Sequence, residues 1–317
     1  MPAELLLGGP LAQTLREEIS RTCADLARQG RQVCLATVLV GAKPESVMYA
    51  RSQEQACKEV GMEFKLCTLP EAITQAALVN EIQALNADPT VNGIILQLPL
   101  PARIDAQAVQ RAIDPRKDAE GVHPVNLGLL VYGVTQCAPC TAIASYHLLK
   151  SLNLDLYGKE AVVVGHSQIV GKPMGLLLLH DFCTVTTCHV ATRDLAAHTR
   201  RADILVVAVG KARLVKAEMV KPGAIVIDVG VNRVPVLKRN GKPALDAVGQ
   251  PRSKTVGDVD YAPIREIASW ITPVPGGVGP LTTTMLLRNV AQAARIRLQE
   301  DRREHPEPPT AWLPFER

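Results

Sequence analysis

The chain has 317 residues, a formal net charge of +4 and a hydrophobic content of 47%. This length and composition allow two ordinary globular domains with a large buried core. The small net charge, the scattered basic residues and an aromatic content of only 3% argue against nucleic-acid binding. The opening residues, MPAELLLGGPLAQ, do not have the pattern of a signal peptide, and no apolar run approaches the length of a membrane span. We therefore expect a cytoplasmic protein with no nucleic-acid or membrane partner.

The chain contains eight cysteines, which in a cytoplasmic protein are expected to be reduced thiols. Cys137 and Cys140 have the spacing of a redox or zinc pair, but the next cysteine along the chain is Cys183. A zinc site needs a second pair or matched histidines nearby. We expect structural thiols and no metal site.

The first half of the chain alternates between apolar strands and amphipathic helices. Strands are predicted over residues 33–40, 64–69 and 93–98, and helices over residues 10–29, 46–60 and 73–85. This order predicts a parallel sheet covered on both faces. The polar segment 114–126 is predicted to be a loop that carries function or joins domains, and a helix over residues 141–152 follows it.

A second series of alternating elements begins after this helix. Strands are predicted over residues 161–164, 185–189, 204–207 and 224–229, and helices over residues 170–179, 194–199, 261–268 and 281–298. The charged, proline-rich tail over residues 300–317 is predicted to be a loose or docking segment. Two α/β units predict a cleft between them, with ligands bound beyond the carboxyl ends of the strands.

The segment AVVVGHSQIVGKP, residues 161–173, fits one ligand-binding motif better than two others. A Walker A loop is excluded because five residues separate Gly165 from Gly171, and Pro173 stands where Ser or Thr would bind magnesium. A nucleophile elbow is excluded because Ile169 occupies the position of its second glycine. A dinucleotide loop at a helix N-terminus near Val170 remains, as does a plain strand–helix turn.

Other segments place this loop in a wider pattern. In chain order they are VLVGAKPESVMYARS, GIILQLPLP, KDAEGVHPVNLG, PCT, VVGHSQIVGKPM, ADILVVAVGKA, GAIVIDVGVNRV, VGDVDY and TPVPGGVGPLTTTMLLRN. From about Leu11 to Leu298, the chain resembles the bifunctional methylenetetrahydrofolate dehydrogenase/methenyltetrahydrofolate cyclohydrolase family. The resemblance implies oxidation of 5,10-methylenetetrahydrofolate with NADP, hydration of the product to 10-formyltetrahydrofolate, and a homodimer.

The resemblance also implies a two-domain α/β fold with a cleft between the domains. The folate-binding and catalytic domain is expected over residues 1–140 plus 283–317, with a returning C-terminal helix. The Rossmann-like NAD(P)-binding domain is expected over residues 141–282.

Matching positions imply the site residues. The expected substrate-binding residues are Tyr49, Gln97, Asp118, Glu120, Pro275, Gly276 and Gly277. The expected cofactor-binding residues are Thr141, Gly165, His166, Ser167, Val170, Gly171, Val190, Gly210 and Val231. For Asp118, a structural role in its loop is an equal alternative.

The positions of the expected catalytic residues Tyr49, Gln53, Gln97 and Glu120 include two departures from the family pattern. Gln53 stands where the family has a lysine four residues after the tyrosine, and Glu120 replaces an aspartate. Glutamine cannot act as a general acid or base, so the cyclohydrolase step is expected to be impaired. Lys58 points elsewhere on the helix, and Lys43 is expected to reach the site only through an unusual backbone path.

The cofactor site departs from the family pattern as well. His166 and Val190 replace an arginine and a serine that address the 2′-phosphate of NADP, so NAD is an alternative cofactor. Two other functions stay open. The first is a fully bifunctional enzyme with compensating residues, and the second is a non-catalytic folate- or nucleotide-binding relative.

Overall fold

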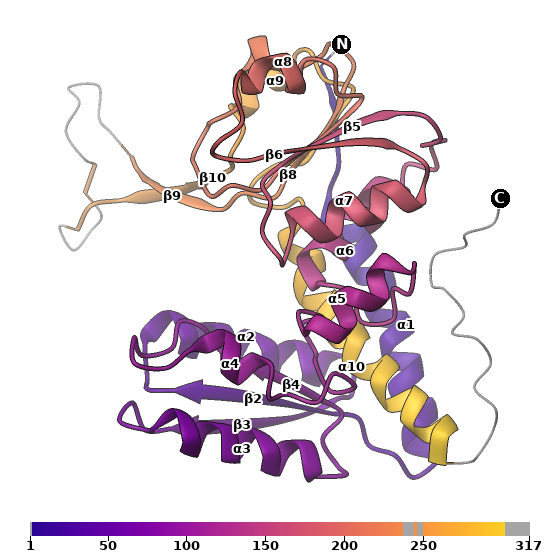
Figure 1. Ribbon diagram of the computed structural model, residues 1–317, viewed down its shortest axis with the longest axis vertical. Helices are drawn as coiled ribbons and strands as arrows, with labels where there is room; N and C mark the ends of the chain where they lie inside the picture. The colour runs from indigo at the N-terminus through magenta and orange to yellow at the C-terminus, as the bar shows by residue number, and fades with distance from the viewer. Residues whose placement is uncertain (1, 237–243, 246–249, 302–317) are drawn as a thin grey trace. The chain divides into compact units, whose positions relative to one another are not determined.

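The computed structural model describes residues 2–236, 244–245 and 250–301 (Figure 1). Contacts between Cα atoms divide the chain into two compact units. Unit 1 contains Met1–Leu11 and Thr141–Leu281, and unit 2 contains Ala12–Cys140 and Thr282–Arg317. Among the described residues, no helix combines the length and the apolar character needed to cross a membrane.

Unit 2 is built on a three-stranded parallel sheet. Its strands are β2 (Cys34–Val40), β3 (Glu63–Leu69) and β4 (Gly93–Leu96), in the order β3-β2-β4. All side chains of the central strand β2 are buried, whereas those of the edge strand β3 are exposed or half-buried. This difference explains why β2 has a continuous apolar sequence.

Helices pack on both faces of this sheet, with α3 on one side and α2 on the other in Figure 1. Leu78 and Ile82 of α3 share an apolar cluster with Val38 of β2 and Val109 of α4. On β4, a Cβ atom at Gly93 would lie 2.5 Å from Val290 of α10, so only glycine permits this packing. The helices are α1 (Gly8–Arg28), α2 (Pro44–Glu59), α3 (Gln75–Ala87), α4 (Ala106–Gln110), α5 (Pro124–Val131) and α10 (Gly279–Asp301).

Unit 1 is built on a six-stranded sheet in which all neighbouring strands are parallel, in the order β1-β11-β8-β7-β5-β6. These strands are β1 (Glu4–Leu5), β5 (Glu160–Val164), β6 (Thr184–Cys188), β7 (Ile204–Val207), β8 (Ile225–Asp228) and β11 (Trp270–Ile271). An antiparallel ribbon pairs β9 (Asn232–Pro235) with β10 (Ser253–Val256). The helical elements are α6 (Cys140–Lys150), α7 (Gly171–His180), α8 (Leu195–Thr199), η1 (Ala217–Met219) and α9 (Tyr261–Arg265).

The two-unit α/β architecture confirms the predicted fold class, and each predicted helix and strand is present. The unit boundaries differ from the predicted division at the N-terminus. Residues 1–11 belong to unit 1 because β1 pairs with β11, and the first segment of unit 2 begins at Ala12. Of the loose tail predicted over residues 300–317, residues 302–317 lie outside the described residues, whereas Glu300 and Asp301 still belong to α10.

Candidate functional site

A cavity of about 480 Å³ opens in unit 2 beside the first half of α2. Its polar lining comes from four places: the turn after β2, the first half of α2, the end of β4 and the loop that follows α4. Parallel strands present their carboxyl ends at the same sheet edge, which is where α/β proteins bind ligands. The cavity is lined by Lys43, Glu45, Ser46, Tyr49, Ile95, Leu96, Gln97, Leu98, Pro99 and Glu120. We call it the α2 cavity.

Tyr49 and Gln53 lie one helical turn apart on α2 and therefore on the same face. The Tyr49 ring lines the α2 cavity and remains partly exposed. Burial raises the pKa of the Tyr49 phenol, and the charges of Cys140 and Glu120 raise it further, whereas contacts with Thr283 and Gln53 lower it. A neutral phenol and its ring face are suited to packing against a planar ligand.

Gln53 is completely buried behind Tyr49. Its Oε1 accepts hydrogen bonds from Thr37 Oγ1 at 3.1 Å and from Gln97 Nε2 at 2.9 Å. Its Nε2 is buried and forms no hydrogen bond of normal geometry with the described residues, since the interaction with Tyr49 does not meet that geometry. A buried donor of this kind is costly unless a ligand supplies an acceptor.

Glu120 contributes a carboxyl group to the α2 cavity. Burial raises its pKa from 4.5 to about 7, with a further contribution from the nearby Asp118 charge. Its side chain forms no hydrogen bond with the described residues. It is therefore a carboxyl group that can accept or release a proton near neutral pH.

Asp118, two residues earlier, has a different environment. Its carboxylate accepts hydrogen bonds from the backbone N–H groups of Gly121 (3.1 Å) and His123 (2.8 Å) and from Asn126 Nδ2 (2.9 Å). It is buried and does not line the α2 cavity. These contacts support the structural alternative for Asp118, because both oxygens are occupied by the loop itself.

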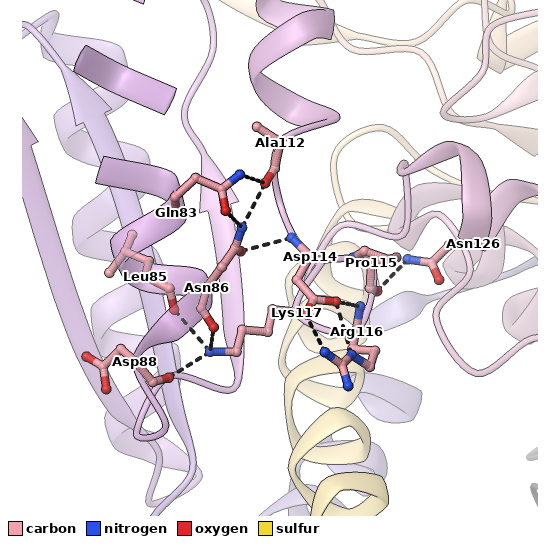
Figure 2. Close-up of polar contacts among 10 residues, drawn as sticks. All are labelled: Gln83, Leu85, Asn86, Asp88, Ala112, Asp114, Pro115, Arg116, Lys117 and Asn126. Carbon is pink, nitrogen blue, oxygen red and sulfur yellow. Dashed lines mark hydrogen bonds and ion pairs between the residues drawn. The ribbon is translucent and has the colours of Figure 1, made fainter. Parts of the chain in front are cut away.

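Lys117 anchors the same loop from its other side (Figure 2). Its Nζ donates hydrogen bonds to the carbonyl oxygens of Leu85 (3.0 Å), Asn86 (2.7 Å) and Asp88 (2.7 Å) at the end of α3. An ammonium group at a helix C-terminus satisfies carbonyls that the helix leaves unpaired. Lys117 is thus a structural cap that fixes the start of the segment carrying Glu120.

Two thiols complete this support. Cys137 Sγ donates to the carbonyl of Asp118 at 2.7 Å, and Cys140 Sγ donates to the carbonyl of Ala119 at 3.4 Å. Burial raises the pKa of both thiols. Residues 2–236, 244–245 and 250–301 contain no cluster of side chains suited to holding a metal ion.

The two lysines considered from the sequence have different positions. Lys58 is exposed and pairs with Glu54 at 2.7 Å, away from the α2 cavity. Lys43 does line the cavity, and its φ of −61° and ψ of 129° are ordinary extended values. The expectation that Lys43 needs an unusual backbone path was therefore wrong, because the residue before α2 already faces this space.

In unit 1, most of the expected cofactor-binding residues meet at one edge of the sheet. Gly165, Val190, Gly210 and Val231 follow β5, β6, β7 and β8, four parallel strands that lie side by side in the order β8-β7-β5-β6. Their loops therefore lie at the shared carboxyl edge. The sequence grouped these residues by motif resemblance alone. The sheet order explains why loops so far apart in the chain lie at one edge.

The loop from Gly165 to Gly171 makes a tight turn before α7. Gly165 has a φ of +126°, and a Cβ atom at Gly171 would lie 2.1 Å from the carbonyl oxygen of Gly165. Ser167 Oγ accepts the N–H of Val170 at 3.1 Å at the start of α7. The backbone N–H groups of residues 166–169 donate no hydrogen bond to the described residues, and these four residues are exposed. Free N–H groups at a helix N-terminus fit a pyrophosphate, so these residues fit the NAD(P) that the resemblance implies.

The positions expected to contact the 2′-phosphate carry no strong anion-binding group. Val190 is fully exposed. The His166 ring lies 5.2 Å from the His189 ring, centroid to centroid, at an angle of 56°. Lys172 lies close to His166 in the sequence and Arg193 lies close to Val190, and both side chains are exposed.

A buried carboxylate that the motif comparison missed organises the Gly210 turn. Asp258 accepts hydrogen bonds from the N–H groups of Val209 (2.7 Å) and Gly210 (2.9 Å), where Gly210 has a φ of +65°. Asp258 is in turn positioned by Asp228, which accepts its backbone N–H at 2.9 Å. The signal in the sequence was the acidic VGDVDY segment.

The remaining expected residues also lie in unit 1. Thr141 is in the first turn of α6, where its carbonyl accepts Ser145 Oγ at 2.9 Å. Gly276 has a φ of +112°, and a Cβ atom at Gly277 would lie 2.7 Å from Thr272 Cβ. Pro275 is exposed. Thus the structure brings Tyr49, Gln53, Gln97 and Glu120 together in unit 2, whereas Pro275–Gly277 belong to unit 1.

Comparison with known proteins identifies the source of these features. Residues 6–120 match the catalytic-domain model of tetrahydrofolate dehydrogenase/cyclohydrolase, and residues 139–298 match its NAD(P)-binding-domain model. The bifunctional protein FolD of Geobacillus thermodenitrificans is 48% identical, with 93% of this chain and 98% of that protein covered.

Two solved structures have the same fold. The bifunctional FolD methylenetetrahydrofolate dehydrogenase/cyclohydrolase of Campylobacter jejuni is 42% identical with a TM-score of 0.85, covering 93% of this chain and 99% of that one. The corresponding enzyme of Trypanosoma brucei, solved with NADP cofactor and an inhibitor, is 36% identical with a TM-score of 0.85, covering 94% and 99%. On sequence and structure together, this chain belongs to the tetrahydrofolate dehydrogenase/cyclohydrolase family.

Proposed function

We propose that this protein oxidises 5,10-methylenetetrahydrofolate to 5,10-methenyltetrahydrofolate and hydrates the product poorly. The proposal rests on family membership and on one observation at the α2 cavity: Gln53, the residue for which the resemblance implies a lysine, is a buried neutral amide. Two of its relatives are named for both the dehydrogenase and the cyclohydrolase.

Dehydrogenation asks the protein mainly to hold and align two molecules. NADP supplies the hydride acceptor when bound, and the free N–H groups of residues 166–169 are the donors for its phosphates. Tyr49 offers a ring face to the folate, and Glu120 offers an acceptor for its N–H groups. None of these tasks needs the lysine ammonium.

Hydration needs proton transfer to and from water and a leaving nitrogen, which a general acid–base group accelerates by typically ~10²–10⁴-fold. Gln53 carries no titratable proton. Its carbonyl oxygen is already occupied by Thr37 and Gln97, so it is poorly placed to orient a water as an acceptor. We therefore expect a large loss in this step.

We further propose that the protein uses NADP with weak discrimination against NAD. Support comes from the exposed apolar side chain of Val190 and from His166, at positions for which the resemblance implies a serine and an arginine. A phosphate gains most from a bidentate arginine, and neither position has one.

Steady-state kinetics in two halves test the proposal. The first half follows methenyl formation from methylenetetrahydrofolate with NADP or NAD. The second half compares methenyl loss with the rate in buffer alone. Dehydrogenase turnover together with a methenyl loss close to the buffer rate supports the proposal. Absence of turnover in both halves points instead to a folate- or nucleotide-binding protein.

Full bifunctionality is the second candidate, and Lys43 is the observation that favours it. Lys43 lines the α2 cavity with Tyr49 and Glu120, so it is the one lysine among the lining residues. If wild-type protein hydrates methenyltetrahydrofolate rapidly, Lys43→Met is expected to abolish that activity, and Lys58→Met serves as the matched control.

We also propose a homodimer formed through unit 1, on the strength of the family resemblance. Light scattering coupled to size-exclusion chromatography tests this assignment, which a monomeric mass at micromolar concentration overturns.

A further inference from the structure

A second cavity in unit 2, of about 410 Å³, is lined in part by residues 114–117, the first part of the loop that carries Glu120 (the Glu120 loop). Its apolar wall includes Val91, Val125, Leu129, Val134 and Ile296. This volume is within the range of small-molecule sites. It shares no lining residue with the α2 cavity. We call it the α10 cavity, because the last turns of α10 form one side.

The polar wall of the α10 cavity consists of residues that hold the Glu120 loop. Asn126 bonds to the carboxylate of Asp118, Cys137 bonds to the carbonyl of Asp118, and Asn289 bonds to the carbonyl of Ala119 at 3.0 Å. Lys117 lines the cavity while capping α3. Figure 2 shows Asn126 bonded to the carbonyl of Pro115, and Lys117 reaching the carbonyls at the end of α3. The two cavities are therefore connected through Lys117–Glu120, a contiguous hydrogen-bonded segment.

Among the described residues, two cations of the α10 cavity wall, Lys117 and Arg297, form no ion pair, and the Lys117 ammonium is already held by three carbonyl oxygens. The lining carboxylate of Glu300 also forms no ion pair with the described residues. Asp114 is paired with Arg116 at 2.8 Å, and Asp301 is paired with Arg31. Arg297 is half-buried in the wall and forms no ion pair with any residue that the structure describes. Burial lowers the pKa of Lys117, and the charge of Arg297 lowers it further, so the two cations are close enough to repel. An anion beside Arg297 would relieve this repulsion.

We infer that the α10 cavity binds a small organic carboxylate with an apolar body, whose carboxylate pairs with Arg297 and whose body packs against Leu129 and Ile296. The planar guanidinium matches a carboxylate in a bidentate arrangement. The apolar wall favours an aromatic or branched acid over an inorganic anion. Because the cavity wall holds the Glu120 loop, binding there changes ligand affinity in the α2 cavity.

Calorimetric titration with benzoate tests the binding step, with benzamide and inorganic phosphate as comparisons. We expect benzoate to bind the full-length protein with a Kd of about 1 mM, an affinity reasonable for so small a probe. Benzamide and phosphate are expected to bind at least about tenfold more weakly, since each lacks one recognition element. No heat with benzoate at ten times this concentration overturns the inference, as does equal binding of phosphate.

Matched variants assign the site. Arg297→Gln is expected to weaken benzoate at least about tenfold, whereas Arg21→Gln, which removes an exposed arginine of α1, leaves it unchanged. Ala293→Phe fills the cavity from α10 and blocks benzoate while keeping the charge of Arg297. Circular dichroism confirms that each variant is folded. Unchanged benzoate affinity in both Arg297→Gln and Ala293→Phe contradicts the assignment.

The coupling is tested by reciprocity, and this step alone rests on the proposed folate site. Saturating benzoate is expected to change the Kd of methylenetetrahydrofolate about fivefold, and the folate must change the Kd of benzoate by the same factor. Failure of folate binding overturns the proposed function and leaves the benzoate result standing. If neither ligand changes the Kd of the other, the coupling is overturned.

Discussion

Gln97 donates a hydrogen bond to Gln53 Oε1 over 2.9 Å, on the same amide oxygen that accepts from Thr37. This relationship fixes the orientation of the Gln53 amide and leaves its Nε2 buried without a hydrogen bond to the described residues. The Gln97 amide and the Thr37 hydroxyl can each present an acceptor instead of a donor by rotating. The surroundings of Gln53 are therefore able to receive a lysine ammonium.

Gln53→Lys is expected to create cyclohydrolase activity. The new ammonium supplies the acid–base group that the step needs, and we expect methenyl loss to rise by at least about 100-fold over wild type, at the low end of general acid–base effects. The measurement is enzymatic methenyl loss at saturating substrate.

Gln53→Met is the matched control, because it keeps the length of the side chain but cannot transfer protons. It is expected to gain no hydration and to lose about 1–3 kcal/mol of stability, since Thr37 and Gln97 lose their shared acceptor. Equal hydration by the lysine and methionine variants contradicts the assigned role of position 53.

Glu120 is expected to make stability fall as pH rises. Its folded pKa of about 7 exceeds the ordinary value of 4.5, so the native state binds this proton more tightly than the unfolded state. The stability that the folded protein gains from this tighter proton binding is fully present below about pH 4.5 and is lost as pH rises through about 7. Glu120→Gln has no carboxyl to ionise. The free energy of unfolding of this variant, relative to that of wild type, is therefore expected to rise by up to about 3 kcal/mol between pH 4.5 and 8.

Urea denaturation of both proteins across this pH range measures the effect. Glu45→Gln, an exposed residue of the same cavity, is the control and is expected to show a much smaller pH-dependent difference. A constant difference between Glu120→Gln and wild type from pH 4.5 to 8 contradicts the assigned environment of Glu120.

His166→Arg combined with Val190→Ser is expected to raise the preference for NADP over NAD. An arginine and a hydroxyl supply a charge-assisted contact and a hydrogen bond to the 2′-phosphate, and we expect at least about a tenfold change in the ratio of kcat/KM values. The measurement is dehydrogenase kinetics with each cofactor. His166→Gln with Val190→Ala is the uncharged control, and an equal gain by that variant argues against the proposed role of these positions.

Gly257→Ala is expected to destabilise unit 1. A Cβ atom at Gly257 would lie 1.7 Å from Asp228 Oδ2, and the Asp228 carboxylate is held by the N–H groups of Gly230, Asp258 and Val259. Because these bonds fix the carboxylate, the clash is expected to cost about 1–3 kcal/mol.

Thermal unfolding measures this cost, and Gly9→Ala in the first turn of α1 is the control. A Cβ atom at Gly9 meets nothing within 4 Å, so that variant is expected to be neutral or slightly stabilised. Equal melting temperatures for Gly257→Ala and wild type contradict the packing described around Asp228.

Sequence periodicity predicted the main elements because their apolar residues are continuous or regularly spaced. The run Ile204–Val207 predicted the buried strand β7, and Leu15, Ile19 and Leu26 predicted the buried face of α1. The short elements α4 and β11 were missed because a few residues carry no measurable period. The position of β1 in unit 1 was also missed, since pairing with a strand more than 260 residues away leaves no local signal.

The site was predictable where it depended on motif residues. The matching positions gave Tyr49, Gln53, Gln97 and Glu120, and the structure places all four around one cavity or directly behind it. Local sequence did not show that Lys43 faces this cavity or that Asp118 is saturated by its own loop. Both depend on side-chain directions that only the folded chain fixes.

One progress curve with wild-type protein, methylenetetrahydrofolate and NADP tests the central claim most directly, with reduced cofactor and methenyltetrahydrofolate followed together. The proposed function predicts that the two products accumulate in equal amounts, and that methenyl then decays at the rate seen in buffer alone. Methenyl that stays far below the reduced cofactor from the first turnovers, with 10-formyltetrahydrofolate making up the difference, would contradict it.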